Sequence, residues 1–558
     1  MKKIYTYLTL LAGASVLILS SCTREVVPTE PEKENTPAKV RTEVVGVKTE
    51  SDETKVTLTG TTFAWQDGDA IAVWTGTTNT SGSFQDCTVS EGIITVTLAE
   101  GESRKNYAVY PASVKDETYA GGTLYVKLPA SYAHTDLLGT KTPLPMVANN
   151  TESSLTFYNV AGLLRITVKA IPNTATGLVF QFPGNKVNGT FAVDNPGTGT
   201  SSIATGTPGS GEDKITVTFP ANTAEEMTLN IPLPTGAYDD VFVTPIGSTT
   251  KVAAVRHIKA GGYTATRARG KQLTATLVSF SIDTDRQIVF APANLVATIG
   301  ADYASTEWNF HAHQHDMVIT SSSQKQSFSV GSKIDTFGFV GEGGSASGKA
   351  EWGISGAGAG STYSGESVPD PLKHDWGESV IGHYAANFWF TPSIGEWEYV
   401  IRNRSTVAII GGVSTSDVRF AKAKLFNDGE GGVQGMIIFP DNYVHPTGLA
   451  APASINVEDK ASKTIGNNYT ESEWAQMEDA GAIFLPSAGY RSGTTMNSVN
   501  SYVQEDNSDA LRYRTRSHIA SRNDTAYRFL VNGTNINFYM ETVSRATGMS
   551  VRLVRELI

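Results

Sequence analysis

The chain has 558 residues, of which 40% are hydrophobic, so it is long enough to form several domains that each bury a core. Lys and Arg total 44 against 55 Asp and Glu, and the resulting net charge of −11 argues against nucleic acid as a partner. The two cysteines are Cys22 and Cys87, too few for a fold built on disulfides.

The first residues predict export. Lys2 and Lys3 precede an apolar run over residues 4–18, and small residues then lead into Cys22. This pattern is typical of a lipoprotein signal peptide over residues 1–21, with Cys22 acylated after cleavage. The alternative is an ordinary secretory signal with an incidental cysteine. The polar, Pro- and Glu-containing residues 22–42 predict a flexible tether, so we expect a surface-exposed outer-membrane lipoprotein.

From residue 43 onward, short segments alternate polar and apolar residues between turns rich in Gly, Asp and Asn. Four of them are Ala70–Trp74, Ile93–Leu98, Leu124–Leu128 and Leu163–Val168. Such segments predict antiparallel strands packed as sandwiches. We therefore expect a mostly-β protein, with one β-sandwich domain at 43–150 and a second at 151–278.

Residues 279–558 differ in composition and predict an α+β domain. Two helices are expected, over 393–404 and 470–480, because Ser393 with Glu396 and Thr470 with Glu473 have the spacing of capping boxes. Their tryptophans, Trp397 and Trp474, recur at helical intervals with other apolar residues, so they are predicted to be core anchors rather than ligand contacts.

One cluster has the residue types of a metal site. On a strand, His311, His313 and His315 would share a face and present three imidazoles to a zinc ion. The alternative is a solvated strand, and because no further ligand is fixed by spacing we predict no metal and no cofactor. The sequence also lacks a Gly-x-Ser-x-Gly or His-Glu-x-x-His motif, so we do not expect an enzyme.

Aromatic residues in the Gly/Ser-rich segment 341–388 are candidates for binding. Trp or Tyr rings stack on the apolar faces of sugars, and long loops on a rigid scaffold commonly carry binding sites. The candidates are Trp352, Tyr363, Trp376 and Tyr384. The alternative for each is packing in the core.

Three segments carry a family resemblance. Residues 63–73, which contain Trp65, Gly68 and Asp69, together with 157–168 and 179–193, resemble the N-terminal region of Bacteroides-type fimbrillins, the subunits of fimbriae. The resemblance implies transthyretin-like β-sandwiches. It also implies proteolysis that removes the lipid and the first strand, here 43–47, whose place a donor strand from the next subunit takes. Candidate cleavage sites are Arg41, Lys48 and Lys55.

The C-terminal region resembles a different group. Residues 389–402, 434–441, 481–491 and 548–555 are similar to C-type-lectin-like domains, which share a fold with formylglycine-generating enzymes. No cysteine lies in this region, so that enzymatic activity is not expected. The calcium-and-sugar triplets of true C-type lectins are also absent, so the resemblance implies a binding module without naming its ligand.

Together these features predict a fimbrial subunit that acts as a tip adhesin, because the chain ends within the lectin-like motif without a spare strand to donate. Its partners would be other fimbrial subunits, bound by donor-strand exchange, and a glycan or host surface protein, with the outer membrane contacted through the lipid. The alternative is a monomeric outer-membrane lipoprotein that binds glycan for nutrient uptake. An enzyme acting on surface polysaccharide is a third hypothesis.

Overall fold

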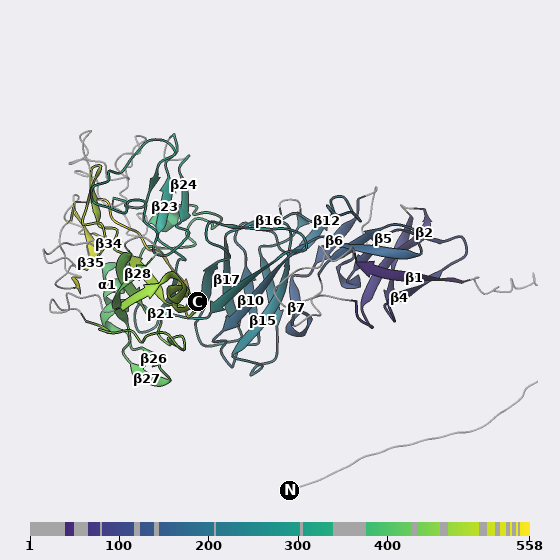
Figure 1. Ribbon diagram of the computed structural model, residues 1–558, viewed down its shortest axis with the longest axis horizontal. Coiled ribbons are helices and arrows are strands. Elements are labelled where there is room, and N and C mark those ends of the chain that lie inside the picture. The colour runs from purple at the N-terminus through teal and green to yellow at the C-terminus, as the bar shows by residue number, and fades with distance from the viewer. Residues whose placement is uncertain are drawn as a thin grey trace, which may run out of the picture.

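The computed structural model describes residues 40–49, 65–78, 81–116, 123–138, 144–205, 208–301, 305–338, 375–426, 432–457, 467–500, 511–518, 525–531, 536–537, 543–544 and 547–558. Strands account for 49% of the structure and helices for 7%, which confirms the mostly-β prediction. The predicted signal peptide and Cys22 lie outside the described residues. Figure 1 shows an elongated molecule, with β1 and β2 near one end, β10 and β17 in the middle, and β28 and β34 towards the other end.

The first sheet forms the N-terminal sandwich. Its seven strands follow the order β3-β2-β5-β8-β9-β1-β4 and fold over so that both halves contribute to one core, which includes Val45, Val73, Val96 and Phe157. The strands are β1 (Arg41–Thr49), β2 (Ala70–Thr78), β3 (Ser81–Thr88), β4 (Ile93–Leu98), β5 (Ser103–Tyr110), β8 (Met146–Asn149) and β9 (Ser154–Asn159). In β4 every second residue is buried, as the alternating sequence predicts.

The middle sandwich packs a three-stranded sheet, β15-β10-β20, against a five-stranded sheet, β18-β17-β11-β14-β7. Its strands are β7 (Ser131–Ala133), β10 (Gly162–Lys169), β11 (Gly177–Gln181), β14 (Lys214–Thr218), β15 (Glu226–Leu233), β17 (Asp240–Ile246), β18 (Ala254–His257) and β20 (Gly270–Thr276). A three-stranded sheet contains β6 (Tyr125–Leu128), β12 (Gly189–Ala192) and β13 (Pro208–Ser210). A two-stranded sheet contains β16 (Gly236–Tyr238) and β19 (Tyr263–Ala265).

The chain crosses between the two sandwiches around the predicted boundary at 150. The strands β6 and β7 precede the boundary, but they pair with β12 and β14, which lie in the region assigned to the second domain. After it, β9 still belongs to the first sheet, beside β8 and β1. The boundary therefore falls inside the seven-stranded sheet. Local strand patterns do not show which sheet a strand joins.

Not every pairing is antiparallel as predicted. The pairs β1–β9, β10–β20, β14–β7 and β28–β30 are parallel. Parallel neighbours need a connection that returns to the same end of the sheet, so each of these pairs joins segments separated in sequence.

In its described residues, the C-terminal domain contains several small sheets around hydrophobic cores, three of which are large. Its strands are β21 (Phe280–Ser281), β22 (Gln287–Phe290), β23 (Leu295–Thr298), β24 (Glu307–Phe310), β25 (Lys333–Ile334), β26 (Val407–Ile410), β27 (Val413–Ser416), β28 (Phe420–Phe426), β29 (Val433–Ile438), β30 (Asn467–Thr470), β31 (Ile483–Pro486), β32 (Tyr490–Ser492), β33 (Thr495–Asn497), β34 (Leu511–His518), β35 (Thr525–Val531), β36 (Ile536–Asn537), β37 (Val543–Ser544) and β38 (Val554–Leu557). The strand β22, near the start of the domain, pairs with β38 at its end.

Both predicted helices form with their capping boxes. The helix α1 (Ile394–Glu398) continues as a π-helical turn over Tyr399–Asn403, and α2 spans Glu471–Asp479. Trp397 and Trp474 are buried with 0% and 2% exposure, so their predicted role as core anchors is confirmed. Shorter 3₁₀ turns cover Ala112–Val114, His134–Asp136 and Trp376–Glu378. Among the described residues, no helix has the length and apolarity needed to cross a membrane.

Candidate functional site

The first strand is held in the middle of a sheet rather than at its edge. On one side, β1 runs antiparallel to β4, with Arg41 opposite Leu98 and Gly46 opposite Ile93. On the other side it runs parallel to β9, with Gly46 opposite Ser154 and Thr49 opposite Phe157. The two sets of pairs overlap only at Gly46, so β1 passes from β4 to β9 along its length. Its removal would leave one unpaired edge on β4 and another on β9, at successive positions along its path.

The side chains of β1 bury little area for a strand in this position. Val45 is fully buried in the core, whereas Val44 is 61% exposed. Glu43 lies beside Arg104, whose Nε donates to Glu43 Oε1 at 3.1 Å, and the Arg104 side chain is 2% exposed. Arg104 also donates to the backbone carbonyls of Asn150 and Glu152. The buried Val45, the partly buried Val47 and the carboxylate of Glu43 thus fix the register of β1.

Two of the predicted cleavage sites are described, and both lie on β1. Arg41 is its first residue and Lys48 is its last but one, and both are exposed. Cleavage after Arg41 would leave the strand in place, whereas cleavage after Lys48 would remove nearly all of it. Lys55 lies outside the described residues.

The middle sandwich and the C-terminal domain meet at a polar contact centred on Asp240. This carboxylate is buried and accepts a hydrogen bond from Tyr384 Oη at 2.9 Å and another from His257 Nδ1. The second nitrogen of the ring, Nε2, lies 2.9 Å from the carbonyl oxygen of His311. Since a carbonyl oxygen and an ionised carboxylate both only accept, His257 donates from both nitrogens and is an imidazolium.

A second set of contacts crosses the same interface. Arg256 donates to the Glu478 carbonyl at 2.7 Å and to Asp479 Oδ1 at 2.7 Å, and Thr276 donates to the Asp479 carbonyl at 2.5 Å. These bonds join β18 and β20 to the C-terminal end of α2. Beside them lies a cavity of about 230 Å³, lined by residues of both domains that include His257, His313 and Glu478.

The charge of His257 should make this interface sensitive to pH. Burial lowers the pKa of His257, but the attraction and hydrogen bond of Asp240 outweigh it, so the pKa is raised overall. A histidine whose pKa is raised by folding contributes stability that is fully present below its unfolded value of about 6.5 and is lost as the pH rises through the folded pKa. We expect the midpoint of urea unfolding to differ most between the wild type and His257→Gln near pH 6, and less at each higher pH. A difference that stays constant or grows with pH would refute the assignment of an imidazolium.

The described aromatic candidates for ligand stacking are buried. Trp376 and Tyr384 are each 3% exposed. Trp376 packs against Trp308 and Phe337, and Tyr384 packs against Trp389 while its hydroxyl bonds Asp240. The expectation that these two rings are available for stacking is therefore wrong, and the alternative of core packing holds for both. Trp352 and Tyr363 lie outside the described residues.

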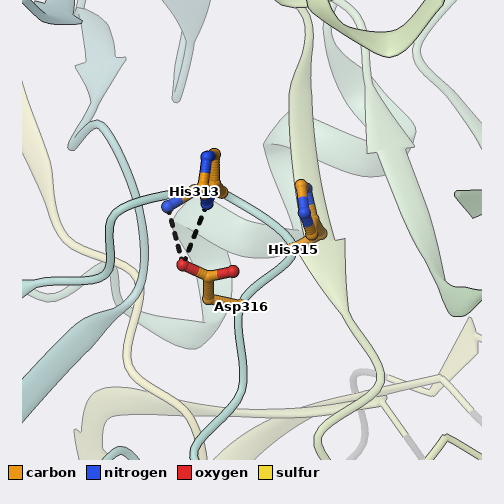
Figure 2. A group of neighbouring side chains, drawn as sticks. All are labelled: His313, His315 and Asp316. Carbon is orange, nitrogen blue, oxygen red and sulfur yellow. Dashed lines mark hydrogen bonds and ion pairs between the residues drawn. The ribbon is translucent and has the colours of Figure 1, made fainter. Parts of the chain in front are cut away.

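The histidine-rich segment is a turn, which corrects the predicted strand. The strand β24 ends at Phe310, and the turn is closed where Asp316 N donates to the His313 carbonyl at 3.2 Å. His311 is separate from the others, because its ring bonds Asp335 at 3.1 Å. The turn instead brings His313, His315 and Asp316 together, with potential ligand atoms all within 4.8 Å of one another. Figure 2 shows these three side chains.

The three residues differ in their surroundings. The rings of His313 and His315 stack with their centroids 5.2 Å apart. Asp316 Oδ2 accepts from the backbone N of His313 and lies 3.3 Å from its Nδ1, and this contact raises the pKa of His313. Burial lowers the pKa of His315, which favours the neutral ring.

Two parts of these sites have no signal in the sequence. Asp316 was not a predicted ligand because the assumed strand would have placed it on the opposite face from the histidines. The contacts of Asp240 were also missed, because Tyr384 lies 144 positions away in the chain. A single sequence carries no mark of such a pairing.

Comparisons with known proteins bring no family assignment. No protein-family model and no curated protein matches the chain. Two similar solved structures are each described as a "putative cell adhesion protein". The one from Bacteroides ovatus is 14% identical and covers 39% of this chain and 86% of its own, with a TM-score of 0.24. The one from Bacteroides uniformis is 15% identical and covers 48% of this chain and 95% of its own, also with a TM-score of 0.24.

A third similar structure is a fimbrial protein from Bacteroides ovatus. It is 10% identical, covers 92% of this chain and 98% of its own, and has a TM-score of 0.21. At such identities and TM-scores, these similarities by themselves establish neither the fold nor the function of this chain.

Proposed function

We propose that this protein is a fimbrial subunit of the bacterial surface with an adhesive rather than enzymatic role. It is exported as a lipoprotein through Cys22, loses β1 by proteolysis, and accepts a strand from a neighbouring subunit in the vacated position. The observation that carries this proposal is the position of β1. It is a terminal strand of the N-terminal sandwich, yet it lies between β4 and β9 and pairs with both.

A vacated groove of this kind suits an extended strand from another chain. Unpaired strand edges are templates for added strands, since each edge presents backbone donors and acceptors in a row. Removal of β1 leaves one such edge on β4, beside the space of Val45, and a second on β9, beside the positions of residues 46–49. We expect the incoming strand to carry a β-branched apolar residue at the position of Val45 and an acidic residue at that of Glu43, because Arg104 otherwise loses its carboxylate partner.

The strand β38 is not available as a donor strand in this structure. It pairs with β22 along its whole length, from Val554 to Leu557. The side chains of Val554 and Leu557 are both buried. A strand held in this way is not free to fill the groove of another subunit. We place the binding surface of the subunit on the C-terminal domain, which resembles C-type-lectin-like domains in sequence.

The proposal is tested by mapping the N-terminus of the protein recovered from the native cell surface by mass spectrometry. A start after Lys48 or Lys55, without acyl chains, supports strand removal. A start after Arg41 would leave β1 in the sheet and contradict strand exchange at this groove. A triacylated Cys22 on nearly every molecule would also contradict it.

Strand capture can be measured directly. We expect a chain that begins after Thr49 to bind a peptide of residues 41–49 and to regain its thermal stability. The peptide Val45→Asp should bind at least about 100-fold more weakly, because an unpaired carboxylate is costly to bury. The matched control is the peptide Val44→Asp, whose changed residue faces solvent. Equal affinity of the two variant peptides, measured by isothermal titration calorimetry, would show that the peptide does not take the register of β1.

A further inference from the structure

We propose that His313, His315 and Asp316 form a metal site that binds one Zn²⁺ ion. The three residues lie on one turn of the C-terminal domain, and their potential ligand atoms are all within 4.8 Å of one another. Two imidazoles and one carboxylate are a ligand set that zinc accepts. With Zn–N and Zn–O bonds of about 2.0–2.2 Å, ligand atoms around a tetrahedral ion are about 3.5 Å apart, so the side chains need to close by roughly 1 Å. The two stacked rings, whose planes differ by 17°, also have to rotate so that a nitrogen lone pair of each points at the ion.

The buried ring of His315 is the observation that points to a ligand. His315 is 7% exposed, and its Nδ1 is buried without a hydrogen-bond partner in the described part of the chain. Buried polar atoms are normally paired, because leaving one unpaired opposes folding. The ion pair between His313 and Asp316 gives those two side chains a partner but leaves Nδ1 of His315 without one. A metal ion bound to this turn would also provide a partner for His315.

The carboxylate is available to a metal ion. Both hydrogen bonds from His313 go to Oδ2 of Asp316, and Oδ1 accepts no hydrogen bond from the described residues. Figure 2 shows the same arrangement, with dashed lines reaching one carboxylate oxygen and none reaching His315. The side chain of His313 is 45% exposed and that of Asp316 is 31% exposed, so an ion can enter from solvent.

The residue between the two histidines holds the turn in place. Gln314 is 4% exposed, its Nε2 donates to Glu478 Oε1 at 2.8 Å, and its Oε1 accepts from Phe484 N at 2.8 Å and from Arg552 Nη2 at 2.7 Å. These bonds fix the turn to α2, β31 and the segment before β38. A supported backbone of this kind limits how far the ligands can move, which favours metal binding.

The surrounding charge favours a cation. The groups that act on the two rings from the rest of the molecule are the carboxylates of Glu478 and Glu471 on α2, in addition to Asp316 on the turn itself. Three protein ligands leave one position of a tetrahedral zinc ion open. His313 also lines the cavity between the middle sandwich and the C-terminal domain.

The test is titration of the purified full chain with ZnCl₂, followed by isothermal titration calorimetry and equilibrium dialysis. We expect one Zn²⁺ per chain and a dissociation constant that rises at least about 10-fold in each of His313→Ala, His315→Ala and Asp316→Asn. The matched control is His383→Ala, which removes a histidine of similar exposure, 49%, paired with one carboxylate, Asp239. It should leave the affinity unchanged.

Folding of the variants is checked by thermal unfolding followed by circular dichroism. Should His315→Ala fail to fold, His313→Ala decides the question, because a half-exposed side chain is removed with little effect on the core. Unchanged zinc affinity in His313→Ala would overturn the proposal. So would binding without a defined stoichiometry, or an equal loss of affinity in His383→Ala.

Discussion

Replacement of Asp240 by alanine is expected to destabilise the contact between the middle sandwich and the C-terminal domain by about 3–5 kcal/mol, because it leaves a buried charge without its partner. The carboxylate accepts from His257 and from Tyr384, which come from the two sides of the interface. Without it, the imidazolium of His257 has only the His311 carbonyl, and the buried hydroxyl of Tyr384 has lost its acceptor. Chemical unfolding and limited proteolysis between the two domains measure the effect.

The neighbouring residue provides the control for this prediction. Asp239 pairs with His383 at 3.2 Å, but their side chains are 35% and 49% exposed. Exposed pairs of this kind contribute about 0–1 kcal/mol, so Asp239→Ala should change the unfolding midpoint little. If both variants lose the same stability, the burial of Asp240 is not the cause. If neither loses any, the two domains are not held by this contact.

Replacement of Trp397 by alanine is expected to cost about 3–5 kcal/mol, the range for removal of a large aromatic side chain from a core. Trp397 is fully buried and stacks on Phe529, with ring centroids 4.9 Å apart and planes at 18°. It also lies 5.7 Å from Phe290, so a single ring joins α1, β22 and β35. Urea unfolding followed by circular dichroism measures the loss.

The conservative variant Trp397→Phe separates packing from any other role of this residue. The indole Nε1 has no hydrogen-bond partner among the described residues, so a phenyl ring loses volume but no hydrogen bond. We expect Trp397→Phe to retain most of the stability that Trp397→Ala loses. Full stability in Trp397→Ala would mean that the residue is not a core anchor, against both its burial and its place in the helical pattern.

Local features of the sequence predicted local structure well. Ile93–Leu98 was predicted as a strand and is β4, because alternation of polar and apolar residues specifies both the extended backbone and its buried face. The two capping boxes located α1 and α2 for a similar reason, since a side chain that caps a helix acts on the backbone three residues away.

Features that depend on distant residues were not predictable in this way. The alternating histidines fit a strand by pattern, but Gln314 between them is pulled inward by Glu478 and Arg552, 164 and 238 positions away, and the segment turns. The burial of Trp376 and Tyr384 has the same origin, because the rings that cover them include Trp308 and Phe310 on β24. The pairings that cross residue 150 were not predictable either, because strand pairing, rather than strand pattern, decides which sheet β6, β7 and β9 join.

The contact between Glu43 and Arg104 has a kinetic consequence for strand exchange. When β1 leaves, Arg104 stays anchored to the carbonyls of Asn150 and Glu152 but its carboxylate departs with the strand. The open groove therefore gains one positive charge beside its unpaired edges. Opposite charge accelerates the diffusional encounter of two partners, and dissolved salt screens this attraction over about 10 Å at 0.1 M. An acidic incoming strand is thus captured faster than a neutral one, and its advantage shrinks as ionic strength rises.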